Sequence, residues 1–289
     1  MPGQTYTEMR PVAALTGVVS AVWVQHVDPG AEPHRQRHLP NGSVDVVCRV
    51  GAAPQIVGPR TAPVVDVLPA GTTVVGARLR PEAAGAVLGV PARELVDRTV
   101  DAAELWSVVA DRLGDDLTGG GHDRGIARLL QRALLDAIGD AQPVDPVVAE
   151  TVRRLEQGGA GTLTAIRSDL YVSERHLRRR IGEAVGLAPK PLQRMLRFQR
   201  FLAATQLARA RDEQPGGAGL APLAAAAGYA DESHLNRECR RLTGPTAGGF
   251  LAETDRTCGC GHDHGPSIAR FLGGAPLSAA AGVDPATIA

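Results

Sequence analysis

The chain has 289 residues, of which 44% are hydrophobic and 3% aromatic, so it is long enough for two domains with cores of mainly Val, Leu and Ala. It contains no run of 18 apolar residues, and its first residues lack a cationic segment followed by an apolar stretch. These features argue against a membrane span and a secretion signal. Four cysteines do not suggest a disulfide scaffold in a chain of this length. We therefore expect a cytoplasmic protein.

The net charge of zero conceals an uneven distribution of charge. Residues 1–150 hold 13 Arg and 18 acidic residues, whereas residues 151–257 hold 17 Arg and Lys against 11 acidic residues. A basic half suggests that this half meets a polyanion such as nucleic acid. Ordinary variation of surface charge is the alternative, and charge alone does not decide between them.

The pattern of apolar residues changes near residue 80. Before it, Val-rich runs broken by Pro and Gly predict strands within residues 18–27, 42–50, 62–71 and 72–81. After it, helical periodicity dominates, notably in residues 92–113 and 125–140. Loops are expected at residues 117–125 and 209–222, and a boundary at residues 139–146.

The sequence GYADESHLNRECRRLTG, residues 228–244, predicts a short helix with one apolar stripe. At 100° per residue, Leu235, Cys239 and Leu242 lie together, whereas Ser233, Arg237 and Arg240 lie opposite them, with Asn236 and Arg241 on the flanks. Upstream, an Ala-rich helix ends at Gly228, which suits a tight turn. Two short helices joined by a tight turn describe a helix-turn-helix, whose second helix fits the DNA major groove. A solvated amphipathic helix is the alternative.

A second copy of the pattern favours the helix-turn-helix. Residues 171–186 align without a gap with residues 229–244, 58 positions later. The cationic face recurs as Arg175 and Arg179, with Arg178 beside them, and the buried stripe is expected as Leu177, Ile181 and Ala184. Between the copies, a long helix with a wide apolar face is expected to hold the two units together: Leu192, Met195, Leu196, Phe198, Phe201 and Leu202.

Residues 162–251 resemble the AraC/XylS family of transcriptional regulators. The resemblance is strongest in the second unit, where Gly228, Tyr229, Ser233, His234, Arg237, Gly244 and Pro245 match the family's signature in order. It implies an all-helical DNA-binding domain with two helix-turn-helix units on a linking helix. The chain departs from the family pattern at Arg167, usually a small residue, at Tyr171, usually Gly, and at Leu235 and Cys239, usually aromatic.

The N-terminal half is similar to that of some actinobacterial members of the family, which implies a small β-rich sensor domain followed by helices. The expected fold class is therefore α+β, with a β-rich domain and following helices in residues 1–145, an all-α double helix-turn-helix domain in residues 146–257 and a flexible tail in residues 258–289. Polar residues among the strands line a ligand pocket or, in the favoured alternative, form surface or structural pairs: Arg37, His38, Asp45, Arg78 and Arg80.

Specific roles can be assigned to the two recognition helices. The DNA-binding residues are predicted to be Ser173, Arg175, His176, Arg178, Arg179, Arg180, Ser233, His234, Asn236, Arg237, Arg240 and Arg241. Base reading is expected of Arg175, Arg179, Ser233, Asn236, Arg237 and Arg240. Phosphate contacts are expected of Arg178, Arg180 and Arg241, with Arg194 and Arg197 as weaker candidates.

The tail sequence TCGCGHDHG places Cys258, Cys260, His262 and His264 at alternate positions. Thiolate and imidazole donors suit zinc or copper, but the spacing is not that of structural zinc sites. A tail without physiological metal, and hence no cofactor, is the favoured alternative, and a regulator that senses metal through the tail is a further hypothesis.

No phosphate-binding loop, nucleophile elbow or zinc-protease motif occurs, so we expect a non-enzymatic transcription regulator. A DNA-alkylation repair protein with Cys48 or a tail thiol as acceptor is the enzymatic alternative. Double-stranded DNA is the expected partner. Further candidate partners are RNA polymerase, an unidentified small-molecule effector and a second copy of the chain.

Overall fold

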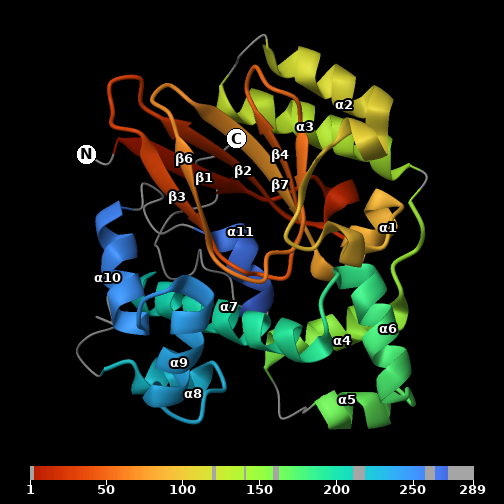
Figure 1. Ribbon diagram of the computed structural model, residues 1–289, viewed down its shortest axis with the longest axis vertical. Coiled ribbons are helices and arrows are strands. Elements are labelled where there is room, and N and C mark those ends of the chain that lie inside the picture. The colour runs from red at the N-terminus through yellow and green to blue at the C-terminus, as the bar shows by residue number, and fades with distance from the viewer. Residues whose placement is uncertain are drawn as a thin grey trace.

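The computed structural model describes residues 3–118, 122–139, 141–158, 163–210, 219–257 and 264–272. All the strands in these ranges lie within the first 101 residues of the chain. In Figure 1 they occupy the upper part of the molecule, and most helices of the second half of the chain lie below them. The arrangement confirms the predicted fold class, a β-rich N-terminal domain with following helices and then an all-α domain with two helix-turn-helix units on a linking helix.

Two antiparallel sheets form the N-terminal domain. The larger has the strand order β1-β2-β7-β4-β5-β8, and β3 pairs with β6 in the smaller. The four predicted strands correspond to β2, β4, β6 and β7, whereas β1, β3, β5 and β8 were not predicted. The bounds are β1 Gln4–Met9, β2 Val19–Val27, β3 His34–His38, β4 Asp45–Arg49, β5 Gln55–Val57, β6 Val64–Leu68, β7 Thr73–Leu79 and β8 Thr99–Asp101.

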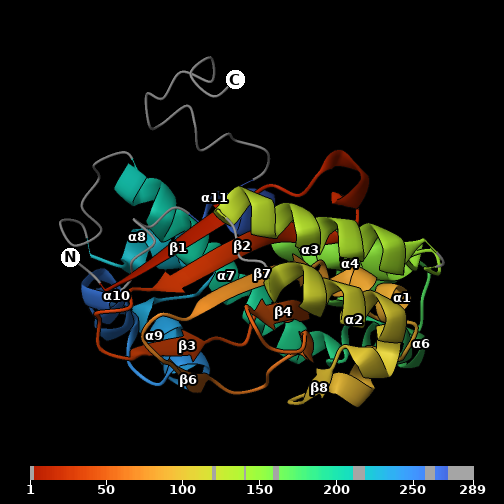
Figure 2. The same ribbon diagram turned by 90° about the horizontal axis from the view of Figure 1, so that it is seen from above.

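The two faces of the larger sheet are covered differently. On one face, α2 (Ala103–Thr118) and α3 (Asp123–Ile138) enclose an apolar core that includes Val22, Ile56 and Leu130. On the other face, Trp23 and Val74 pack with Leu68 of β6 in a smaller cluster. Figure 2 shows the helix pair and the β3–β6 pair on opposite sides of the larger sheet. Alternating inward residues of the strands therefore meet apolar partners on both faces.

The helix predicted across residues 92–113 is wrong in its first half. The 3-10 helix η3 (Ala92–Leu95) ends at Val96, whose ψ of 128° is not helical, and Asp97 follows with a positive φ of 57°. The next residues pair with β5 as strand β8, with Val100 opposite Ile56. Asp101 then accepts a hydrogen bond from the backbone N–H of Ala103, where α2 begins. Pairing with a distant strand has overridden the local helical pattern.

A second apolar core joins the C-terminal helices. Its residues run from Val148 to Leu251, whereas the core under the sheet ends at Leu134. The predicted boundary between residues 145 and 146 stays a prediction. The helices are α4 Pro146–Gln157, α5 Leu163–Asp169, α6 Glu174–Val185, α7 Pro189–Ala210, α8 Ala221–Ala226, α9 Glu232–Thr243 and α10 Ala247–Thr257.

The two halves meet along α6. The 3-10 helices η2 (Pro81–Ala83) and η3, together with α1 (Ala84–Leu88), pack against this helix. At its C-terminal cap, Gly186 has a φ of 85°, and a Cβ there would lie 2.7 Å from the carbonyl oxygen of Ala92. At the other end of the interface, the Arg37 guanidinium makes two hydrogen bonds of 2.8 Å to the Glu253 carboxylate of α10.

Residues 264–272, within the predicted flexible tail, differ from that expectation. They form helix α11 (Gly265–Ile268) and a 3-10 turn, with Ile268 buried. Ser267 donates to Glu8 of β1 through both its backbone N–H and its hydroxyl, at 3.0 and 2.8 Å. Within the described ranges of the chain, no helix combines the length and apolar character needed to cross a bilayer.

Candidate nucleic-acid interface

Each recognition helix follows a short helix and a turn that needs one left-handed residue. In the first unit this residue is Tyr171, with a φ of 53°, and in the second it is Gly228, with a φ of 84°. The next residue, Val172 or Tyr229, donates its backbone N–H to the carbonyl five positions earlier. Both turns therefore end their first helix in the same hydrogen-bonded motif.

The gapless alignment of the two units holds for the helices but not for the turns. The recognition helices α6 and α9 begin at Glu174 and Glu232, 58 residues apart. The left-handed residues Tyr171 and Gly228 are 57 residues apart. The second turn is therefore one residue longer than the first. Tyr171 is 95% exposed, so packing against neighbouring residues does not fix its side chain.

Both helices start with a side-chain cap. The Ser173 hydroxyl accepts a hydrogen bond from the backbone N–H of His176 at 3.3 Å, and Asp231 accepts one from that of His234 at 2.6 Å. These oxygens satisfy N–H groups that the first helical turn leaves without a partner. Ser173 therefore has a structural role in addition to its predicted place at the DNA interface.

The buried stripes agree with the helical periodicity, with one correction. Leu235, Cys239 and Leu242 are buried in α9, as predicted. In α6 the stripe is Leu177, Ile181 and Val185, whereas Ala184 is only half-buried. Val185 joins the apolar core of the C-terminal helices, whereas the backbone of Ala184 lies beside Gly85 of α1.

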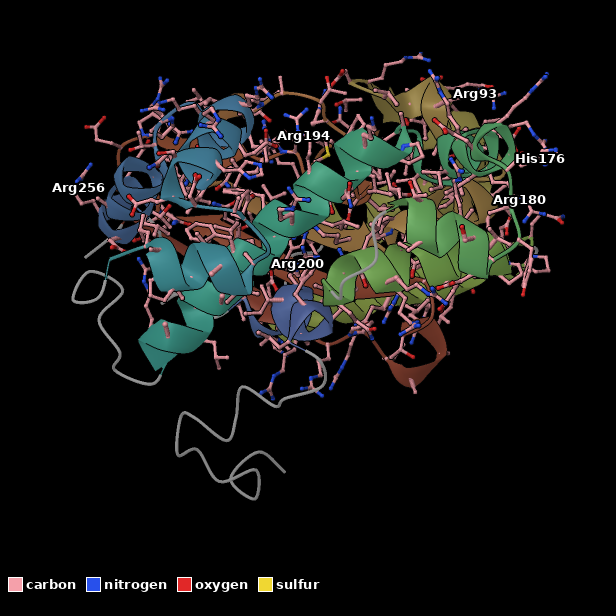
Figure 3. The ribbon with its side chains drawn as sticks, turned by 90° about the horizontal axis from the view of Figure 1, so that it is seen from below. Arg93, His176, Arg180, Arg194, Arg200 and Arg256 are labelled. Carbon is pink, nitrogen blue, oxygen red and sulfur yellow. The ribbon has the colours of Figure 1, made fainter. Side chains whose placement is uncertain are left out.

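The cationic faces point outward on both helices. Exposed residues of the two faces are Arg175, His176, Arg178, Arg179, Ser233, Arg237, Arg240 and Arg241. Figure 3 shows His176 at the outer surface of the molecule. Among the described residues, four of these arginines make no ion pair or hydrogen bond: Arg175, Arg178, Arg237 and Arg240. Unpaired guanidinium groups are available to base edges and phosphates without first breaking an internal contact.

Three predicted contact residues are already used inside the protein. The Asn236 side-chain oxygen accepts a hydrogen bond of 2.9 Å from the backbone N–H of Ala247, at the start of α10. The His234 ring packs edge-on against Tyr229, with ring centroids 5.2 Å apart. Arg180 pairs with Asp145, the residue that caps α4, at 3.4 Å. A contact of these side chains with DNA would have to replace or share these internal contacts.

The candidate phosphate contacts near α7 are also held by internal partners. Glu238, almost fully buried in α9, pairs with Arg194 at 2.6 Å and with Arg241 at 3.3 Å. Arg241 keeps 65% of its side chain exposed. The Arg197 guanidinium lies over the Tyr229 ring, 5.6 Å from its centroid. Of these arginines, Arg241 is the best placed to reach a phosphate.

The linking helix α7 is buried on the predicted wide face: Leu192, Met195, Leu196, Phe198 and Phe201 are buried, and Leu202 is partly buried. Sequence reasoning missed Arg200, which donates to the backbone carbonyls of Leu155 in α4 and Ala227 after α8. Figure 1 shows α7 passing between the two units. The helix thus joins both units and α4 in one core.

The polar residues of the strands, which were candidates for a ligand pocket, are held by partners inside the protein. This agrees with the alternative that the sequence analysis favoured, in which they form surface or structural pairs. Arg78 pairs with Asp45 at 3.1 Å, and His38 pairs with Asp66 at 3.1 Å. Arg80 donates to the carbonyl oxygen of Thr16 at 2.9 Å. Together with the contact between Arg37 and Glu253, these pairs occupy all five predicted polar groups.

Cys48 was a candidate acceptor thiol, and the Cys and His residues of the tail were candidate metal ligands. Cys48 is completely buried, and burial raises the pKa of its thiol to about 11, which is the opposite of an activated nucleophile. Cys258, Cys260 and His262 lie outside the described residues. His264 lies within them, where its Nδ1 is 3.3 Å from the Glu8 carboxylate. Among the described residues, no three His, Cys, Asp or Glu side chains gather as metal ligands.

Comparison with protein families finds a match within the N-terminal half of the chain. Residues 7–101 match the domain of unknown function DUF6597. No curated protein matches the chain. Two solved structures of ToxT from Vibrio cholerae are similar to it: an apo variant from strain SCE256, with 9% identity, 86% of this chain and 96% of that chain covered and a TM-score of 0.39, and ToxT from strain O395, with 8% identity, the same coverage and a TM-score of 0.38.

Sequence reasoning also missed an arginine from the N-terminal domain. Arg93 of η3 lines an open groove along α6 together with Glu174, Arg175, Arg178, Arg179 and Gly182. Its own sequence surroundings predicted only an amphipathic helix. The packing of η3 against α6, which joins residues about 90 positions apart, is what brings it to this face.

Proposed function

We propose that the protein is a sequence-specific DNA-binding transcription regulator that reads the major groove with α6 and α9. The observation that carries the proposal is the recurrence of one unit: a short helix, a left-handed turn residue and a capped helix that buries an apolar stripe. Both copies expose arginines on the opposite side. Two such modules on one chain gain affinity from binding the same duplex.

The exposed arginines divide into two expected roles. Arg175 and Arg179 of α6, and Arg237 and Arg240 of α9, are proposed to reach base edges, because Arg pairs well with guanine acceptors in the major groove. Arg178 and Arg241 are proposed to contact phosphates. Asn236 and Arg180 are weaker candidates, because internal hydrogen bonds already hold their side chains.

Selection of bound fragments from random DNA, followed by footprinting, would identify the operator and its half-site spacing. On that operator, we expect Arg240→Ala to weaken binding by about 1–3 kcal/mol and to relax the preference for one base pair. Arg241→Ala should weaken binding to all sequences similarly and reduce the dependence of affinity on salt.

A matched control is Arg112→Ala, which removes an exposed arginine from α2 of the N-terminal domain. Its affinity for the operator should equal that of the unchanged protein. If Arg240→Ala and Arg241→Ala also leave affinity unchanged, the exposed face of α9 is not the DNA-binding face. RNA polymerase, a small-molecule effector and a second copy of the chain stay predicted partners.

A further inference from the structure

We propose that the DNA-binding surface extends onto the N-terminal domain, where Arg93 contacts a DNA phosphate beside the first recognition helix. The inference rests on the proposed function and adds to it a binding site outside the two helix-turn-helix units. The site is the open groove lined by Arg93, Glu174, Arg175, Arg178, Arg179 and Gly182. Figure 3 shows Arg93 next to α6, the helix that carries His176.

The charges of the groove favour an anion. Four of its six residues are arginines, and the only carboxylate among them, that of Glu174, already accepts a hydrogen bond of 2.7 Å from Arg167. The groove is open to solvent, so its arginines keep their hydration and their charge. A guanidinium group matches phosphate oxygens in geometry as well as charge.

Arg93 is linked to a predicted base-reading residue through one carboxylate. Glu183 lies 3.7 Å from Arg93 and 3.6 Å from Arg179. Both arginine side chains remain more than half exposed, at 53% and 61%. An exposed ion pair contributes little to stability, so a phosphate that approaches from solvent can replace the distant carboxylate as the partner of Arg93.

The backbone that carries Arg93 is fixed relative to α6. The neighbouring residue, Ala92, is buried, and its carbonyl oxygen lies directly against Gly186 at the end of α6. The neighbouring helix α1 also packs closely on α6: a Cβ on its residue Gly85 would lie 2.8 Å from the carbonyl oxygen of Glu183. This close packing holds Arg93 at a set position beside the recognition helix, which reduces the ordering cost of a contact with DNA.

The test uses the full chain and a fluorescent duplex of random sequence, about 30 base pairs or roughly three helical turns long, because phosphate contacts do not depend on sequence. Binding is measured by fluorescence anisotropy across a series of salt concentrations. One lost phosphate contact lowers the slope of log affinity against log salt by about 0.9, which corresponds to about an eightfold loss of affinity near 0.1 M salt. We expect this result for Arg93→Ala, and a preserved slope for Arg93→Lys.

Two further variants separate a phosphate contact from other effects. Arg98→Ala removes an exposed arginine of the same segment that donates to the backbone carbonyl of Glu94 and does not line the groove, so its slope should not change. Glu183→Gln breaks the ion pair but keeps the cation, so it should preserve or strengthen DNA binding. If Arg93→Ala acted only by loosening the domain interface, Glu183→Gln would weaken binding as well.

Each outcome decides between the inference and the function on which it rests. An unchanged slope for Arg93→Ala, equal losses for Arg93→Ala and Arg98→Ala, or a loss for Glu183→Gln overturns the role of Arg93. If Arg241→Ala still weakens binding to this duplex and lowers the salt slope, the proposed function stands without it. If the unchanged protein does not bind the duplex, both proposals fall together.

Discussion

Replacement of Gly186 by Ala tests whether the N-terminal domain is packed as closely against α6 in solution as in the structure. Gly186 caps α6 in the left-handed conformation, and a Cβ there would lie 2.7 Å from the carbonyl oxygen and 2.9 Å from the carbonyl carbon of Ala92. Backbone atoms cannot rotate away as a flexible side chain can. The substitution must therefore push η3 away from α6.

Gly89 provides a matched control. It caps α1 in the same left-handed conformation, with a φ of 70°, and its N–H also bonds to the carbonyl four residues earlier. No atom lies within 4 Å of a Cβ built there. Gly89→Ala therefore carries only the cost of a left-handed Ala, about 1–2 kcal/mol. Gly186→Ala adds the cost of overpacking, about 1–3 kcal/mol, for a total of about 2–5 kcal/mol.

Thermal unfolding followed by circular dichroism measures the difference. For a chain of this size, each kcal/mol shifts Tm by roughly 2–4 °C, so Gly186→Ala should unfold roughly 2–12 °C below Gly89→Ala. Because Arg93 is held by the same contact, Gly186→Ala should also weaken binding to random duplex DNA, whereas Gly89→Ala should not. Equal values of Tm for the two variants would refute the close packing of η3 on α6.

The remaining predictions concern buried titratable groups. Burial alone raises the pKa of Glu8, but a hydrogen bond from His264 and the charge of Arg78 hold it at about 2, below the usual 4.5. The ionised carboxylate therefore stabilises the fold above about pH 4.5, and this contribution is lost as the pH falls towards 2. Glu8→Gln should lower the free energy of unfolding near neutral pH, with a difference that shrinks below about pH 4.5; a difference independent of pH would contradict the assignment. The Cys48 thiol, buried and with a pKa of about 11, should resist iodoacetamide near pH 8 in the native chain and react after unfolding, as read by peptide mass spectrometry. Rapid alkylation of native Cys48 would revive the alternative of a thiol acceptor.

Local periodicity was enough to predict the helices α6 and α9. Two features of α9 depend only on residues within one or two helical turns, so the local sequence predicts them. These features are the buried stripe of Leu235, Cys239 and Leu242 and the cap formed by Asp231. The length of the first turn was not predictable in this way. Tyr171 takes the left-handed position that Gly228 holds in the second unit, although the aligned sequences place it opposite Tyr229.

Features that depend on distant partners escaped prediction. Strand β3 has the sequence HRQRH, which shows no apolar alternation, and forms because β6 pairs with it. The place of Arg93 follows from contact between the two halves of the chain. A single sequence contains no signal for such contacts, so the domain interface and its cationic groove could be found only from the structure.

The contact of Ser267 with Glu8 joins two residues that are 259 positions apart. During synthesis on the ribosome, β1 is made long before Ser267, so the hydrogen bonds between them can form only after the intervening chain has been synthesised. Until then the Glu8 carboxylate lacks the hydrogen bonds from Ser267 and His264, and its nearby partners are the Tyr6 hydroxyl and the charge of Arg78. The sheet can form before Ser267 is synthesised, but this edge of it gains the hydrogen bonds from Ser267 only after α11 has packed against β1.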